Sequence, residues 1–196
     1  MWAGEERDIP DWLNLPSTSH PLALWDSLHD AEIVSIHSNL LQRTIELVIE
    51  IRQLSHFHKL GEGFQFLLHL DGVQSARALH YAKWPGEFSV PSESSREEER
   101  RLISEYQSKW REESASWNEF QTAITAGNKQ IFCIHDAAIL ILGDSIVALK
   151  LCGQLNHSKY HEVFLRAEKL RILGNDESKY SLDEFRKLGE TYWANR

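Results

Sequence analysis

Hydrophobic and polar residues alternate along several short segments of the chain, which is the pattern of half-buried β-strands. The clearest cases are TIELVIEI (44–51) and GFQFLLHL (63–70). Asp71 and Gly72 follow the second segment, and this dipeptide favours a hairpin into a further strand. The less regular but β-rich segment AEIVSIHSNL (31–40) precedes TIELVIEI across a short connection. The pattern therefore predicts an antiparallel three-stranded meander within residues 28–82.

A second β-like region covers residues 130–173. Two alternating segments are joined there by a short turn at Gly143 and Asp144, and the apolar run AAILIL predicts a strand that is covered on both faces. Residues 158–173 fit either a strand or a helix. We prefer a strand with a bulge, which completes a second three-stranded meander.

Helical spacing replaces alternation in two segments. Residues 95–126 carry an apolar stripe at helical spacing and begin with the capping-box pair Ser95 and Glu98, so they predict one long helix inserted between the meanders. Residues 181–194 predict a C-terminal helix that starts with another capping box. The aromatic-rich lead-in at 1–27 predicts one short helix.

The tripeptide His-Asp-Ala occurs twice, at 29–31 and 135–137, each time beside an apolar segment. We interpret both copies as turns that enter a strand, because an Asp before a strand commonly accepts hydrogen bonds from the turn backbone. The recurrence leaves an internal duplication open. The predicted fold is a single α+β domain with a mainly antiparallel sheet of two three-stranded meanders, one long inserted helix and a C-terminal helix.

Charge and composition narrow the range of functions. The 196 residues include 29 acidic and 21 basic ones, for a formal net charge of −8. This charge argues against nucleic-acid binding and favours a partner protein with a basic surface. Cys133 and Cys152 lie in apolar runs and predict free, buried thiols. The N-terminus lacks the pattern of a secretory signal and no apolar run is long enough for a membrane span, so we expect a cytoplasmic protein.

Catalytic motifs are absent: there is no P-loop, dinucleotide fingerprint, nucleophile elbow or Cys-x-x-Cys. Secondary metal candidates are His56 and His58, which would share one face of a strand, and His29 and His135 of the two His-Asp pairs. Because adjacent side chains of a strand point to opposite faces, one metal could not easily take both members of a pair. A structural role is preferred for all four, and we expect no catalytic residue, metal or cofactor.

The segment around Trp84 is the strongest candidate for a contact surface. Trp84 lies at a proline-glycine turn where burial is difficult, and an exposed tryptophan is a typical interface anchor. Acidic residues border it, and we expect these residues to form a carboxylate rim that contacts the partner: Glu87, Glu93, Glu97, Glu98 and Glu99.

These features favour a non-catalytic, acidic protein-binding module. Bacterial immunity and antitoxin proteins offer a class-level analogy, since they are commonly small, acidic and free of catalytic motifs, and they act by occluding a partner. The alternative is a small-molecule or metal-dependent enzyme with a pocket that contains histidines. A homo-oligomer joined through the long helix is a third hypothesis.

Overall fold

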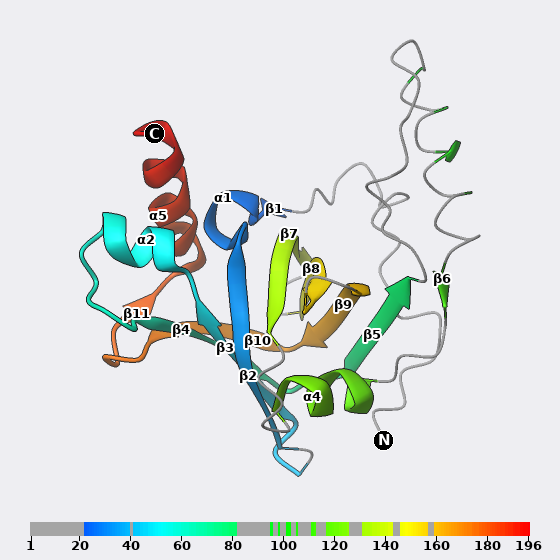
Figure 1. Cartoon of the computed structure of the whole chain (residues 1–196). Helices are drawn as coiled ribbons and strands as arrows, with labels where there is room; N and C mark the ends of the chain where they lie inside the picture. Colours follow the sequence, from blue (N-terminus) through cyan, green and yellow to red (C-terminus); the bar gives the residue numbers. More distant parts are fainter. Residues whose placement is uncertain are drawn as a thin grey trace.

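The computed structural model describes residues 22–39, 41–81, 117–125, 131–142, 146–156 and 159–196, together with short pieces between 95 and 112. An antiparallel sheet dominates this part of the chain, and helices pack around it, so the predicted α+β class is confirmed (Figure 1). No helix in these ranges is long and apolar enough to span a bilayer.

The elements in chain order are β1 (Leu22–Ala23), α1 (Trp25–Leu28), β2 (Ala31–Asn39), β3 (Thr44–Glu50), α2 (Arg52–Phe57), β4 (Gln65–Asp71), β5 (Ser75–Tyr81), β6 (Arg111–Glu112), α4 (Trp117–Thr125), β7 (Phe132–Leu142), β8 (Ile146–Leu155), β9 (Lys159–Ala167), β10 (Lys169–Gly174), β11 (Lys179–Tyr180) and α5 (Leu182–Ala194).

Two antiparallel meanders, β2–β3–β4 and β7–β8–β9, form most of the sheet. On one side β2 pairs with β7, with Ala31 opposite Ile134. On the other side β4 pairs with β10 and β5 pairs with β9, so that β4–β5 and β9–β10 run together as one long ribbon. The pairings therefore lead from β2 through β3, the ribbon, β8 and β7 back to β2, which is a closed circuit of strands.

Strand β3 shows how alternation produces this sheet. Ile45, Leu47 and Ile49 are fully buried, while the Glu46 and Glu50 side chains between them are half-buried on the opposite face. The buried residues of β3 lie opposite apolar residues of β4, in the register Ile45–Leu70, Leu47–Leu68 and Ile49–Phe66. The strand predicted from alternation is confirmed.

The hydrophobic core contains side chains from both meanders and from the helices. Phe185 of α5 is fully buried, and its ring lies 5.2 Å from that of Phe66 in β4. Helix α5 begins with the predicted capping box, in which the Glu184 N–H donates to Ser181 Oγ and the Ser181 N–H donates to Glu184 Oε2. The C-terminal helix is therefore confirmed, and burial of its phenylalanine attaches it to the sheet.

The hairpin predicted at Asp71 and Gly72 is wrong. β4 and β5 do not pair with each other; both pair with the β9–β10 segment instead. The ribbon pairing continues across Asp71 and Gly72 through two backbone hydrogen bonds: the Glu168 N–H donates to Asp71 O (3.0 Å), and the Gln74 N–H donates to Arg166 O (2.8 Å). The pairing along this ribbon satisfies many more backbone groups than one two-residue hairpin turn would, and it outweighs the local preference. The strand preferred for residues 158–173 is confirmed as β9 and β10.

The long helix predicted over 95–126 is wrong in its middle. Arg111–Glu112 forms β6, which pairs with β5. Strand β5 offers unpaired backbone groups along its edge, and pairing with them overrides the local helical preference. Within the predicted range, α4 is helical with the expected residues buried: Trp117, Phe120 and Ile124. At the predicted start, the Glu98 N–H donates to Ser95 Oγ at 3.2 Å.

Candidate functional site

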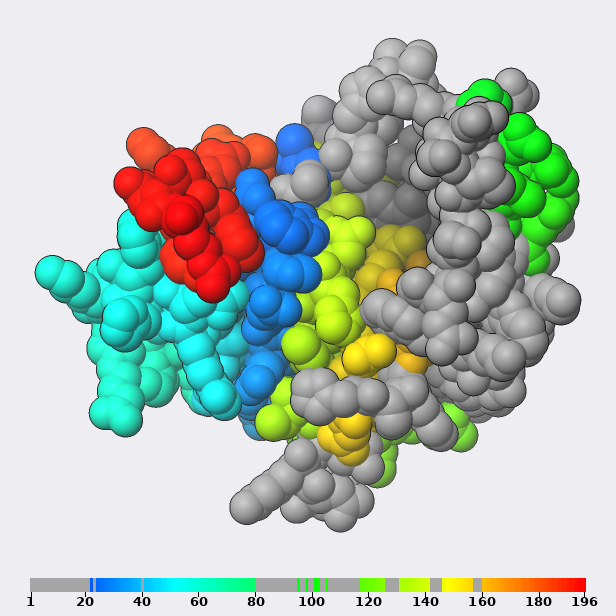
Figure 2. Space-filling model, turned by 45° about the horizontal axis from the view of Figure 1, so that its top comes forward, coloured from blue at the N-terminus to red at the C-terminus, as the bar shows by residue number. Residues whose placement is uncertain are grey.

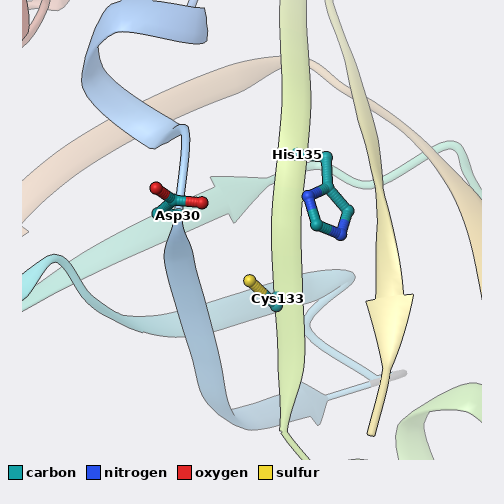
Figure 3. A group of neighbouring side chains, drawn as sticks. All are labelled: Asp30, Cys133 and His135. Carbon is teal, nitrogen blue, oxygen red and sulfur yellow. The ribbon is translucent and has the colours of Figure 1, made fainter. Parts of the chain in front are cut away.

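Three side chains with metal-binding or catalytic chemistry gather where β2 begins beside β7: Asp30, Cys133 and His135 (Figure 3). A carboxylate oxygen, Sγ and a ring nitrogen from these residues all lie within 4.8 Å of one another. Asp30 comes from the turn between α1 and β2, whereas the other two come from β7. Asp30 is exposed and its two neighbours are half-buried, so solvent reaches the cluster.

Main-chain contacts hold the cluster in place. The Asp30 N–H donates to Ile134 O at 2.9 Å, and Ala31 pairs with Ile134 in the β2–β7 register. The pairing of β7 with β8 shifts between Ile134 and Asp136, which leaves a bulge at His135 and can redirect its side chain. Asp30 has a φ of 60°, a left-handed conformation that aspartate tolerates better than most residues.

The two His-Asp-Ala copies meet here, although not in equivalent places. The first copy precedes β2, as predicted. The second copy lies inside β7, so the prediction of a strand-entry turn at His135 and Asp136 is wrong. Phe132 to Ile134 pair with both β2 and β8, and these pairings extend the strand upstream of the tripeptide.

The His29 ring connects the two copies directly. Its Nδ1 lies 2.8 Å from the His135 carbonyl oxygen, and since a carbonyl only accepts, Nδ1 carries the proton and donates. In the neutral ring Nε2 then has a lone pair, and it lies 3.6 Å from Asp30 Oδ1. The ring also stacks on Trp25, with centroids 4.5 Å apart. These contacts fix both the tautomer and the orientation of His29.

Both cysteines are free, as predicted, and Cys152 is buried whereas Cys133 is half-buried. Burial raises the pKa of the Cys133 thiol, and the carboxylates of Asp30 and Glu32 raise it further. Burial raises the pKa of Cys152 to about 12. Because the thiolate is the nucleophilic form, neither cysteine is activated for covalent catalysis in this state.

A row of aromatic side chains lies on the neighbouring helices: Trp25 of α1, Phe57 of α2, and Tyr192 and Trp193 of α5, together called the aromatic face. Successive ring centroids from Trp25 through Trp193 and Tyr192 to Phe57 are 5.0, 5.1 and 5.6 Å apart. Figure 2 shows α5, in red, lying against the blue segment that contains α1 and the cyan segment that contains α2. Trp25 and Phe57 are 36% and 38% exposed, so the face is open to contact.

Two contacts stabilise the α5 end of the aromatic face. The indole N–H of Trp193 donates to the Asp26 carbonyl at 2.9 Å, which fixes the ring against α1. The Arg196 guanidinium lies 5.5 Å from the Tyr192 ring centroid and 5.4 Å from that of Trp193, within cation–π range. The Trp193 and Tyr192 rings are therefore held in place by contacts within the chain itself.

The strand that would place His56 and His58 on one face is not observed, because Arg52–Phe57 is helix α2 and His58 is its C-cap. Fully buried Leu54 anchors this helix to the core. His56 lines a cavity of about 810 Å³. The His58 ring donates from Nε2 to Leu188 O at 2.9 Å and lines a second cavity of about 380 Å³.

The four candidate histidines thus do not converge on one pocket. His29 contacts His135, whereas His56 and His58 lie at separate cavities. Of the predicted contact surface, only Glu98 lies within the described residues, where it is exposed. The others lie outside them: Trp84, Glu87, Glu93, Glu97 and Glu99.

Sequence reasoning missed Asp30 and Cys133 as members of one cluster. Cys133 and His135 are two residues apart, the same spacing that singled out His56 and His58, but the sequence pattern predicted His135 in a turn and not in the strand that contains Cys133. The contribution of Asp30 depends on the β2–β7 pairing, which no local pattern encodes. Comparison with protein-family models, curated proteins and solved structures gave no match, so the functional conclusions depend on this chain's own residues.

Proposed function

We propose that the chain is a non-catalytic protein-binding module that occludes a partner with a basic surface, in the manner of immunity and antitoxin proteins. The observation that carries this proposal is the aromatic face on α1, α2 and α5, in which Trp25 and Phe57 are exposed and Tyr192 and Trp193 are half-buried, in a chain whose net charge is −8.

Aromatic anchors are the residues that contribute most to protein interfaces. Binding hot spots are enriched in Trp, Tyr and Arg, and the aromatic face with Arg196 supplies all three. The Trp193 ring is fixed by its bond to Asp26 O, and Trp25 is fixed by stacking on His29. Since the rings are already ordered, binding costs little side-chain entropy, which favours affinity.

The net charge of the chain determines which kind of partner surface it attracts. A net charge of −8 attracts basic surfaces and repels acidic ones, and it increases the association rate at low salt. The carboxylate rim around Trp84 belongs to the same proposal: Glu87, Glu93, Glu97, Glu98 and Glu99. The exposure of Glu98 supports its part in the rim.

The test begins with the tagged full chain and an extract of its source cells. A captured protein counts only after it has been purified and shown to bind directly, with a Kd that rises with salt concentration. Trp25→Ala and Phe57→Ala should each weaken binding by about tenfold or more, as hot-spot truncations do. Both side chains are partly exposed, so the variants are expected to keep the fold.

Leu41→Ala is the matched control, because Leu41 is 98% exposed and lies in the turn between β2 and β3, outside the aromatic face. It should bind like the wild type. Equal affinity of the wild type and both aromatic variants would refute the role of the face. A Trp84→Ala variant that also binds normally would remove the rim from the proposal.

The enzyme alternative receives less support from the geometry. It required His29, His56, His58 and His135 to converge on one pocket, and two of these histidines lie at separate cavities. Both cysteine thiols also have raised pKa values. A hydrolase screen of the purified chain, with and without added zinc, tests this alternative directly.

We also infer that the two meanders arose by internal duplication. The four strands β2 to β5 correspond in order to β7 to β10. If each strand is replaced by its counterpart, the β4–β10 pairing becomes the β9–β5 pairing, and both are observed. The β2–β7 pairing is unchanged by the same exchange. The two His-Asp-Ala copies do not carry this inference, because one lies at the entry to β2 and the other inside β7. A single superposition that places β2–β3–β4–β5 on β7–β8–β9–β10 would support the inference, and strands that can be matched only one at a time would oppose it.

A further inference from the structure

We propose that Asp30, Cys133 and His135 bind a divalent transition-metal ion, and that zinc fits this donor set best. The proposal does not rest on the protein-binding function, because its three ligands lie at the junction of β2 and β7, outside the aromatic face; His29, which stacks on Trp25, is not one of the three.

The distances between the three side chains suit one metal ion. Zinc bonds of roughly 2.0–2.3 Å place the ligand atoms of a tetrahedral site about 3.5 Å apart. The three ligand atoms here already lie within 4.8 Å of one another, so a contraction of about 1 Å completes the geometry. In Figure 3 the Asp30 carboxylate and the Cys133 sulfur lie on the same side of β7, in the space between β2 and β7.

The backbone that presents these ligands is organised before any metal binds. The turn at Asp30 is fixed to β7 by its N–H bond to Ile134 O, and His29 holds the same turn to the His135 carbonyl. Cys133 lies opposite Glu32 in the β2–β7 pairing, so strand hydrogen bonds set its position. Ligands presented by paired strands lose little freedom on binding, which favours affinity.

The donor types select the metal. Sulfur, imidazole nitrogen and one carboxylate suit zinc and its neighbours cobalt(II) and iron(II), whereas magnesium and calcium prefer sites made only of oxygen. On binding, the Cys133 proton leaves to solvent and a sulfur–metal bond forms. Three protein ligands leave one tetrahedral position, for which water and His29 Nε2, 3.6 Å from Asp30 Oδ1, are the candidates.

Cobalt(II) provides the decisive test, because it binds zinc sites and is coloured. The purified full chain is stripped with a chelator, kept reduced, and titrated with cobalt(II) and then with zinc. We expect one equivalent of cobalt to produce a thiolate-to-cobalt charge-transfer band with tetrahedral d–d bands. Zinc should then displace it stoichiometrically.

Variants assign the ligands. Cys133→Ser should abolish the charge-transfer band, while Cys152→Ser, the matched control at the other cysteine, should retain it. His135→Gln and Asp30→Asn should each weaken zinc binding by at least the roughly 10–100-fold that loss of an outer-shell partner causes. Asp30 is exposed, so Asp30→Asn remains informative if a β7 variant fails to fold.

The outcomes that overturn the proposal are equally specific. A wild-type chain without saturable cobalt binding at one equivalent refutes the site. A charge-transfer band that survives Cys133→Ser, or that disappears in a folded Cys152→Ser, assigns the sulfur ligand elsewhere. Unchanged zinc affinity in both His135→Gln and Asp30→Asn also refutes it.

Discussion

Replacing Gly189 by alanine should destabilise the protein, although alanine is the better helix former. Gly189 lies within α5 and is buried, and α5 packs against α1. A Cβ at this position would lie 2.3 Å from the Asp26 carbonyl oxygen and 2.5 Å from the Ser27 nitrogen. Since these are backbone atoms, no side-chain rotation relieves the overlap, and α5 has to move away from α1.

Three effects determine how much unfolding free energy is lost, one stabilising and two destabilising. Alanine in place of glycine stabilises a helix interior by roughly 0.5–1 kcal/mol. Overpacking a close contact costs about 1–3 kcal/mol. Moving α5 also strains the bonds from Ser27 Oγ to Phe185 O (3.0 Å) and from Trp193 Nε1 to Asp26 O (2.9 Å), each worth about 0.5–1.5 kcal/mol. The net expected loss of unfolding free energy is about 1–5 kcal/mol.

Urea unfolding followed by tryptophan fluorescence measures this loss, and thermal unfolding should show a Tm lower by roughly 2–4 °C per kcal/mol. The control is Lys187→Ala at an exposed position of the same helix, which should change stability by no more than about 0.5 kcal/mol. If Gly189→Ala is as stable as the wild type or more stable, the close packing of α1 against α5 is refuted.

Three further predictions concern single groups. Burial raises the pKa of Asp71, but Arg171, whose Nε donates at 2.8 Å, and then His69 together more than offset this, and the net pKa is lowered. Asp71→Asn should therefore cost about 1 kcal/mol or less near neutral pH. Its urea midpoint should converge with that of the wild type as the pH falls through the folded-state pKa. Burial and then the Asp30 carboxylate raise the pKa of Cys133, so Asp30→Asn should lower that pKa and speed iodoacetamide alkylation of Cys133 in metal-free protein, as followed by mass spectrometry; an unchanged rate would contradict this. Ser181→Ala should reduce the unfolding free energy by about 0.5–2 kcal/mol through loss of the α5 cap, and an unaltered Tm would show that the cap contributes nothing.

Features that depend on neighbours in sequence were predictable. Ile45, Leu47 and Ile49 recur at every second position because one face of β3 has to be covered, and the alternation states this requirement directly. Ser181 and Glu184 satisfy backbone N–H groups within a single turn, so the start of α5 could be predicted from four residues. In both cases the physical cause lies inside the segment.

Features set by long-range pairing were not predictable in this way. Asp71 and Gly72 carry a genuine turn preference, but the ribbon partner that overrides it lies far along the chain in β9 and β10. His29 and His135 are 106 residues apart, and only the β2–β7 pairing brings them together. The candidate metal cluster shares this origin, because its carboxylate and its thiol come from different meanders.

The closed circuit of strands has a consequence for how the chain folds. If the two meanders were separated, β2 and β7 would each have an open edge, and so would β4–β5 and β9–β10. Open edges of this kind promote aggregation, and pairings across about a hundred residues slow folding. In kinetic terms the chain resembles an obligate dimer whose two subunits are covalently linked. Each half protects the edges of the other, and we expect neither half to persist as a folded fragment.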